Sequence, residues 1–353
     1  DDVVGAGVTS KLSVGILSAY QLYGDGSNLT GISAGGFTPD DDKNLLAGTC
    51  AGEDLDGSSG CFNILLGECA GMNMTSGASN IAIGCKAMGN GVTTGNRNIA
   101  LGKLAGCSVT SGNNNIILGW YAGKETTIGK TNIFGGYSAA KCNTSGCYNV
   151  IFGLSAGQCG AAGNRRIFLG QGAGFKSCGD SNIAIGFYAG CQVTTGSENI
   201  AIGSNSLRCA AVTGSNNITL GAYSLKCLTS GNKNIALGSY ALEKCTTSSS
   251  CNIAIGEKAA RCITGSCNIA IGAGVTFTAC NGSGQLAIGV GATHFISGDS
   301  SYNVTLAGIA TVTKSTGVVE ATKFCGDGSA LTGISAGGFS ADDDLNLFAS
   351  NTC

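Results

Sequence analysis

The chain has 353 residues, of which 60 are glycine and one is proline, and its formal net charge is −2. Glycine without a strict three-residue period excludes collagen, and 43% hydrophobic residues are too many for a disordered linker. The small net charge gives no electrostatic reason to expect nucleic acid as a partner, and no apolar run is long enough to predict insertion into a membrane. The composition favours a regular fold in which glycines form the turns.

The first segment, residues 1–43, contains Gly-Asp-Gly-Ser-Asn-Leu-Thr-Gly-Ile at 24–32 and three aspartates at 40–42. Almost the same segment recurs about 302 residues later, at 326–334, with three aspartates at 342–344. We interpret residues 1–43 as a joint, and residues 304–353 as a second joint with the start of another repeat block, so we expect the array to continue past Cys353. Each aspartate triplet is interpreted as a polar loop or, alternatively, as a Ca²⁺ site, although neither has EF-hand spacing.

Between residues 44 and 303 one short unit recurs every 16 to 18 residues, beginning with the pattern Asn-Ile-x-Ile-Gly. The clear anchor asparagines are Asn80, Asn98, Asn115, Asn132, Asn149, Asn182, Asn199, Asn217, Asn234, Asn252 and Asn268, with weaker copies at Asn44, Asn63 and Asn303. Arg166 and Gln285 each replace the asparagine once. This repeat predicts an all-β fold, a parallel β-solenoid or β-roll of about 15 coils with about 17 residues each.

Within each unit the two aliphatic residues lie two apart, so they share one face of a short strand, which we expect each coil to bury. A glycine follows four residues after the anchor and permits the positive φ of a corner. Burying two aliphatic side chains gives about 3 to 6 kcal/mol, whereas ordering the unit costs about 1 to 2 kcal/mol per residue, so coils must stack on neighbours or on other chains. The anchor asparagine is interpreted either as part of an amide ladder or as a turn starter.

The 19 cysteines include a column at 9 to 12 residues after the anchor in nine successive units. Its members are Cys142, Cys159, Cys178, Cys191, Cys209, Cys227, Cys245, Cys262 and Cys280. If the basic residues that often precede them face water, these thiols face inward as small buried side chains. Disulfides are the alternative, either between adjacent coils or within the pairs Cys142 with Cys147, Cys245 with Cys251 and Cys262 with Cys267. Without a Cys-x-x-Cys motif, and with His294 as the only histidine, we expect no metal and no cofactor.

The basic residues that directly precede five of these cysteines form a second candidate site. They are Lys141, Arg208, Lys226, Lys244 and Arg261. They predict either contact with an anionic surface glycan or a solvated face that keeps the chain soluble.

The repeat in residues 182–203, Asn-Ile-Ala-Ile-Gly followed by Ala-Gly and Thr-Thr-Gly, resembles the head repeats of trimeric autotransporter adhesins. The Gly-Asp-Gly-Ser element is similar to joints in tail-fibre proteins of bacteriophages, particularly those infecting marine cyanobacteria. The resemblance implies a left-handed roll assembled as a homotrimer. Two features depart from the adhesin pattern, the longer unit and the many cysteines.

We therefore expect a structural shaft of an extracellular appendage, most simply a phage tail fibre on a virion, which associates with itself as a homotrimer and end to end. The alternatives are a bacterial surface adhesin head and an ice-binding or glycan-binding solenoid. Cysteines favour the phage, because an exported adhesin crosses an oxidising periplasm unfolded. We expect no enzyme activity, since the acids of the repeat region form no evident pair for glycoside hydrolysis. These acids are Glu68, Glu125, Asp180, Glu198, Glu243, Glu257 and Asp299.

Overall fold

The computed structural model describes residues 38–57, 59–208, 211–244, 248–277, 279–301, 304–306, 339–341 and 347–349. The chain divides into two compact units, residues 1–305 and 306–353. Every regular element among the described residues is a β-strand. That part of the chain contains no helix with the length and apolar character of a membrane span.

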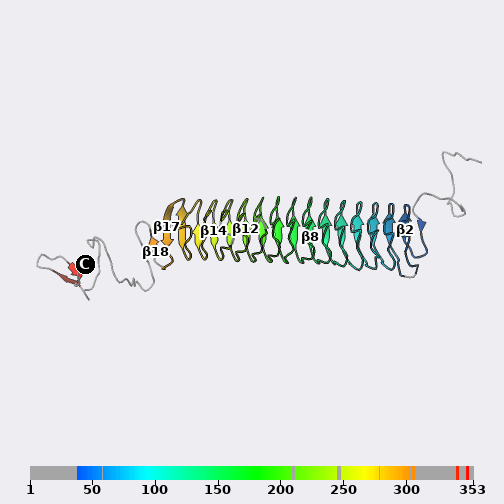
Figure 1. Cartoon of the computed structure of the whole chain (residues 1–353), viewed down its shortest axis with the longest axis horizontal. Coiled ribbons are helices and arrows are strands. Elements are labelled where there is room, and N and C mark those ends of the chain that lie inside the picture. The colour runs from blue at the N-terminus through cyan, green and yellow to red at the C-terminus, as the bar shows by residue number, and fades with distance from the viewer. Residues whose placement is uncertain are drawn as a thin grey trace, which may run out of the picture. The chain divides into compact units, whose positions relative to one another are not determined.

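The first unit is a parallel β-solenoid with one short strand in each coil (Figure 1). Its parallel strands are β2 (Leu45–Ala47), β3 (Ile64–Leu66), β4 (Ile81–Ile83), β5 (Ile99–Leu101), β6 (Ile116–Leu118), β7 (Ile133–Gly135), β8 (Val150–Phe152), β9 (Ile167–Leu169), β10 (Ile183–Ile185), β11 (Ile200–Ile202), β12 (Ile218–Leu220), β13 (Ile235–Leu237), β14 (Ile253–Ile255), β15 (Ile269–Ile271) and β16 (Leu286–Val290). Each strand pairs in register with the next, as Ile99 does with Ile116. The fold predicted from the repeat is confirmed, with about 14 turns of about 17 residues.

Both ends of this parallel ladder carry an antiparallel strand. At the first end β1 (Thr38–Pro39) pairs antiparallel with β2, and Pro39 is the single proline of the chain. At the other end β17 (Thr293–Gly298) pairs antiparallel with β16, with a register shift after Ile288, and β18 (Val304–Leu306) follows. The parallel strands therefore do not end in an open parallel edge.

The direction in which the strand side chains point differs from our expectation. The middle residue of each strand from β3 to β15 is buried, as Ala82 and Ile117 show with no exposed area, while Ile83 is 39% exposed and Leu220 is 48% exposed. Alternation along a three-residue strand makes one side chain point in and two point out. The narrow coil interior accepts one residue per strand, so the prediction that the flanking aliphatic pair is buried was wrong.

The core is filled by complementary sizes at two positions, the middle of the strand and the residue six later. Phe168 and Ile117 face Gly174 and Gly123, whereas Ala82 is matched by the buried Met88. Pairing a large residue with a small one in this way fills the narrow interior of these coils. Where both positions are small, at Ala184 and Gly190, a cavity of about 10 Å³ remains.

The corner glycine that follows each strand is required for two reasons. Gly119 has φ of +124°, and a Cβ placed there would lie 2.7 Å from the carbonyl oxygen of Gly136 in the next coil. L-residues rarely adopt that backbone conformation, and the coil spacing leaves no room for a methyl group. The glycine period in the sequence is thus set by both the turn and the stacking.

The second unit contains a described hairpin of β19 (Phe339–Ala341) and β20 (Leu347–Ala349). Its pairing of Ser340 with Phe348 repeats, 302 residues later, the pairing of Thr38 with Leu46 in β1 and β2. The Gly-Asp-Gly-Ser elements at 24–32 and 326–334 lie outside the described residues, and the boundaries at 43 and 303 stay a prediction. The second copy nevertheless opens with the same local structure as the first.

Candidate functional surfaces

A buried column of anchor asparagines runs along the solenoid. The side chain of Asn132 donates to Oδ1 of Asn115 at 3.0 Å and to the Gly146 carbonyl at 2.8 Å. Its own Oδ1 accepts from the backbone N–H and the side-chain amide of Asn149, both at 3.0 Å. The side-chain amide of Asn132 thus donates two hydrogen bonds and accepts two, which satisfies this buried polar group completely. The interpretation of the anchor asparagines as an amide ladder is confirmed.

The ladder begins on a carboxylate rather than an amide. Asp40 accepts from the backbone of Asn44 at 2.8 Å, from its side-chain amide at 2.9 Å and from the backbone of Asp42 at 3.1 Å. Burial raises the pKa of the Asp40 carboxyl, but the hydrogen bonds from Asn44 and Asp42 outweigh it and hold this pKa below its ordinary value. This favours the polar-loop interpretation of the first aspartate triplet, while residues 342–344 lie outside the described residues.

A second polar column, which sequence reasoning missed, lies two residues before the anchors. Backbone N–H groups in one coil donate to a side-chain acceptor in the next, as Asn96 does to Asn113 at 2.7 Å and Asn164 does to Asp180 at 2.7 Å. Serines continue it, since the Ser197 N–H donates to Ser215 Oγ at 3.0 Å. The members share an acceptor atom and not a residue type, which hides the column from a search for identical residues.

The first and third residues of strands β3 to β15 form a surface that we name the aliphatic face. Its side chains are Ile, Leu, Val and one Phe, and each is half-buried or exposed by no more than 48%. At Gly135 the row lacks a side chain, and the ring of Phe152 fills the place, since a Cβ on Gly135 would lie 2.4 Å from Phe152 Cδ1. No charged residue interrupts this face, which makes it an unusual surface for a soluble monomer.

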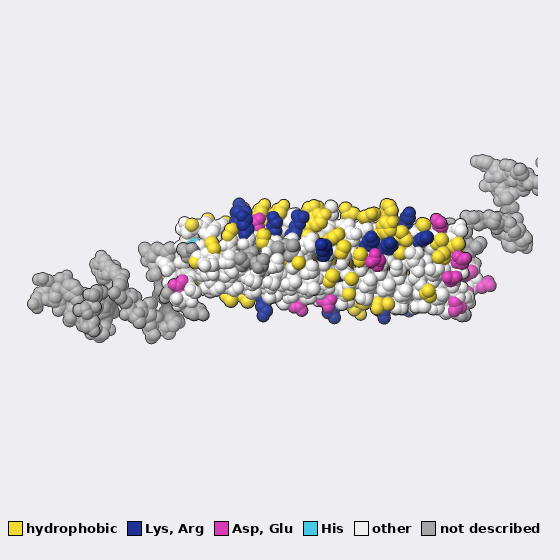
Figure 2. All heavy atoms as spheres, in the orientation of Figure 1, with side chains coloured by type: hydrophobic (Ala, Val, Ile, Leu, Met, Phe, Trp, Pro, Cys, Tyr) yellow, Lys and Arg dark blue, Asp and Glu magenta, His cyan; other side chains and the backbone are white. Residues whose placement is uncertain are grey.

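Basic side chains lie over aromatic rings in a second surface, which we name the cation–aromatic stripe. Figure 2 shows basic and hydrophobic side chains gathered along one long edge of the solenoid, and acidic ones near its N-terminal end. The cation-to-ring distances are 5.7 Å for Lys103 on Trp120, 5.5 Å for Lys124 on Tyr121, 5.8 Å for Lys141 on Tyr121, 5.1 Å for Arg208 on Tyr188, 5.2 Å for Lys226 on Tyr223 and 5.8 Å for Arg261 on Tyr240. Four of the five predicted glycan contacts belong to it, whereas Lys244 is exposed without such a ring contact.

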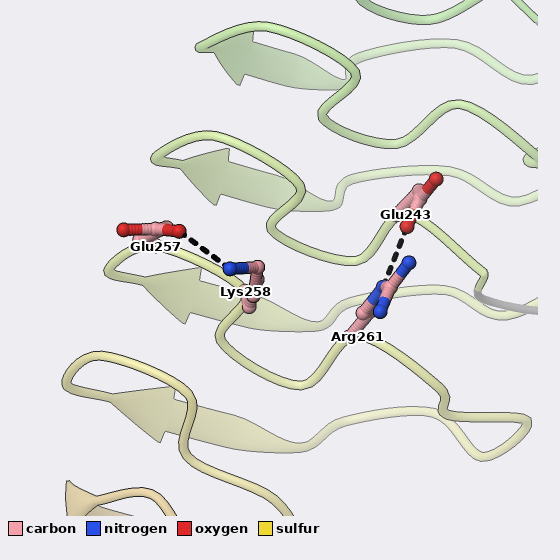
Figure 3. A network of polar contacts seen from close by, with 4 residues as sticks. All are labelled: Glu243, Glu257, Lys258 and Arg261. Carbon is pink, nitrogen blue, oxygen red and sulfur yellow. Dashed lines mark hydrogen bonds and ion pairs between the residues drawn. The ribbon is translucent and has the colours of Figure 1, made fainter.

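Two ion pairs lie near the C-terminal part of the stripe (Figure 3). Arg261 Nε contacts Glu243 Oε2 at 2.6 Å across neighbouring coils, and Lys258 contacts Glu257 at 2.7 Å. The hydrogen bond and charge of Glu243 raise the pKa of Arg261 above its usual value. Arg261 therefore forms an ion pair with a carboxylate, whereas the other cations of the stripe form none among the described residues.

Most described cysteines of the predicted column do not face inward. Cys191 is buried, but Cys159, Cys178, Cys262 and Cys280 are exposed. The column lies in turns, where strand alternation does not fix side-chain direction, and so the prediction of an inward column was wrong for most of its described members. Cys209 and Cys245 lie outside the described residues.

The disulfides within single units stay a prediction, and Cys245 of the pair with Cys251 lies outside the described residues. Cys142, Cys147, Cys251, Cys262 and Cys267 are free thiols. Burial is the main cause that raises the pKa of the Cys142 thiol to about 11, and the charges of Glu125 and Cys159 add to it.

No group of three or more His, Cys, Asp or Glu side chains in the described part of the chain is arranged to hold a metal ion. His294, near the C-terminal end of the solenoid, has Nε2 at 2.7 Å from the Thr276 carbonyl oxygen. Comparisons with protein-family models, with curated proteins and with solved structures found no match for this chain.

Proposed function

We propose that this chain is a non-catalytic shaft segment of an extracellular fibre, and that it assembles as a homotrimer through the aliphatic face. The exposed, uncharged aliphatic face is the observation that carries the proposal. With coils about 4.8 Å apart, the 12 steps from β3 to β15 make it about 60 Å long, and a width of about 10 Å gives about 600 Å². That is at the lower end of the ~600 to 1,000 Å² per partner of a stable protein interface.

The choice of three chains and of a virion appendage rests on the resemblance to adhesin heads and phage tail fibres. The repeated hairpin of β19 and β20 supports a tandem array of such shafts, in which continuation is covalent. The capped ends of the ladder argue against growth by stacking the coils of one chain on those of another. A bacterial surface adhesin is the alternative setting for the same architecture.

The test is the mass of the purified chain in solution, measured by light scattering. We expect three chains in the native particle, and loss of assembly when Ile200 and Ile235 on the aliphatic face are both replaced by lysine. Ser111→Lys, at an exposed turn outside that face, is the matched control and should leave the mass unchanged. A monomeric native chain would exclude assembly through this face.

A second candidate function, saccharide binding, is favoured by one part of the cation–aromatic stripe. Trp120 is 47% exposed and Tyr137 is 46% exposed, and their rings meet edge to face at 5.5 Å with Lys103 beside Trp120. Exposed rings stack on sugar rings and ammonium groups attract carboxylates, so an anionic polysaccharide is the matching ligand. Tyr137→Ala should weaken binding of a uronic-acid polysaccharide by about tenfold or more while the particle mass stays native; unchanged affinity would reject the site.

A further inference from the structure

Among the residues that the structure describes, three pairs of cysteines occupy equivalent positions in adjacent coils. Cys251 and Cys267 each precede an anchor asparagine, and the strands that follow are in register, with Ile253 opposite Ile269. Both cysteines are exposed, and both have the same backbone conformation, with φ of 58° and 60°. The backbone N–H of Cys267 donates to the carbonyl of the residue before Cys251, Ser250, at 2.9 Å. The two residues are therefore direct neighbours along the solenoid axis.

The other two pairs follow the same rule. Cys50 and Cys69 lie six residues after their anchors, with φ of 57° and 52°, and the Cys69 N–H donates to Thr49 of the adjacent coil at 2.8 Å. Cys142 and Cys159 lie ten residues after their anchors, and each donates its N–H to the following coil, at 2.9 and 2.8 Å. Register, not nearness in sequence, brings each pair together.

We propose that these three pairs are sites of reversible disulfide formation between adjacent coils, formed when the protein meets a low-molecular-weight disulfide such as oxidised glutathione. In the first step the thiolate of one cysteine attacks the oxidant, forms a mixed disulfide and releases one reduced glutathione. In the second step the neighbouring thiolate attacks the protein sulfur of that mixed disulfide and releases the second glutathione. Two protein thiols are oxidised, one glutathione disulfide is reduced, and the two protons end on the released thiols.

The coil spacing fits such a bond. In-register coils about 4.8 Å apart place the Cα atoms within the 4.4 to 6.8 Å that disulfides span. Parallel Cβ vectors at that spacing must approach by a few tenths of an ångström, since bonded cysteines prefer Cβ atoms about 3.5 to 4.5 Å apart. Strained and exposed disulfides are readily reduced, so these bonds are expected to be reversible and to form outside a reducing cytosol.

Cys262 provides the control, because it is exposed and neither adjacent unit has a cysteine at the same distance from its anchor in the sequence. The position ten residues after the anchor is Lys244 in the preceding coil and Thr278 in the following one. Cys262 is also the nearest alternative partner of Cys267 along the sequence. Its behaviour separates pairing by register from pairing by sequence nearness.

The experiment uses the purified full chain, fully reduced and then incubated with oxidised glutathione, trapped by alkylation, digested and mapped by mass spectrometry. We expect linked peptides for Cys251 with Cys267, Cys50 with Cys69 and Cys142 with Cys159, each lost on mild reduction. In Cys267→Ser the Cys251 link should disappear and Cys251 should carry glutathione, whereas Cys262→Ser should retain the Cys251–Cys267 link.

Three results would overturn the proposal. The first is a link between Cys262 and Cys267, and the second is stable glutathione on both members of each pair without any link. The third is a link between different chains, which mixing chains of normal and heavy isotope content would reveal as mixed-mass peptides. None of these outcomes depends on whether the native particle is a trimer.

Discussion

Nε of Arg166 donates to Oδ1 of Asn149 at 3.0 Å, so an arginine holds the place that asparagine holds in the neighbouring coils. The guanidinium is fully buried, and its further partners are the Ser177 carbonyl at 2.6 Å and Asn143 Oδ1 at 2.9 Å, both uncharged. Burial lowers the pKa of Arg166 to about 10, against the opposing charges of Cys178 and Asp180. Arginine has no side-chain acceptor, so it cannot accept a hydrogen bond from the next anchor as asparagine does.

Replacing this arginine should stabilise the solenoid. Because its pKa is lowered on folding, the cost of burying the cation is full at neutral pH and is relieved only as the pH rises through about 10. Arg166→Asn removes that cost and restores an acceptor, so we expect the free energy of unfolding at pH 7 to rise by about 1 to 3 kcal/mol. Denaturant unfolding checks this, with the exposed Arg165→Asn as control. A less stable Arg166→Asn variant would show that the guanidinium contacts outweigh its desolvation.

Interrupting the ladder should have the opposite effect. Asn132→Ala leaves the buried backbone N–H of Asn149 without its acceptor, and it removes one hydrogen bond each from the Asn149 side-chain amide and the Gly146 carbonyl. Each buried polar group left unpaired costs about 1 to 3 kcal/mol, so we expect a loss of about 2 to 5 kcal/mol in the free energy of unfolding. Thr131→Ala, at the exposed adjacent position, should change it by less than about 1 kcal/mol. Equal effects of the two variants would mean that the ladder adds little.

Two glycines with the same backbone conformation provide a test of core packing. Gly174 and Gly190 have φ of +58° and +53°, but a Cβ on Gly174 would lie 2.5 Å from the Phe168 ring, whereas on Gly190 it would meet Ala184 at an ordinary 3.4 Å. The conformational cost of alanine is shared, so the difference isolates the clash. We expect Gly174→Ala to lower the free energy of unfolding by about 1 to 3 kcal/mol more than Gly190→Ala. Thermal unfolding of both variants measures this difference.

The start of the ladder should give a pH dependence. The pKa of Asp40 is lowered on folding, so its contribution is present above the ordinary carboxyl pKa and is lost as the pH falls through the lower, folded value. The group is exposed, so the contribution is no more than about 1 kcal/mol. We expect Asp40→Ala to be less stable than the native chain at pH 6, with the gap closing towards pH 2. A gap that stays constant over that range would remove the carboxylate from the explanation.

The repeat determined much of this structure in advance. Asn-Ile-x-Ile-Gly fixed the strand, the corner glycine and the anchor column, because each coil has the same hydrogen-bonding needs. It did not determine which face of the strand points inward: Ala82 and Ile83 are both apolar, and only the small interior of the coil decides between them. The sequence also did not predict which cysteine side chains are buried. Cys159 is exposed and Cys191 is buried because both lie in turns, where the two-residue alternation of a strand does not apply.

The antiparallel strands at the two ends have a consequence for the control of length. A parallel stack of identical strands resembles the growing tip of an amyloid, to which any similar strand can add. Here Pro39 in β1 cannot donate to an incoming strand, and β17 reverses direction beside β16. The number of coils encoded in the chain therefore determines the length of the solenoid. Further strands do not add to either end of its parallel sheet, as they would add to the end of an amyloid fibril.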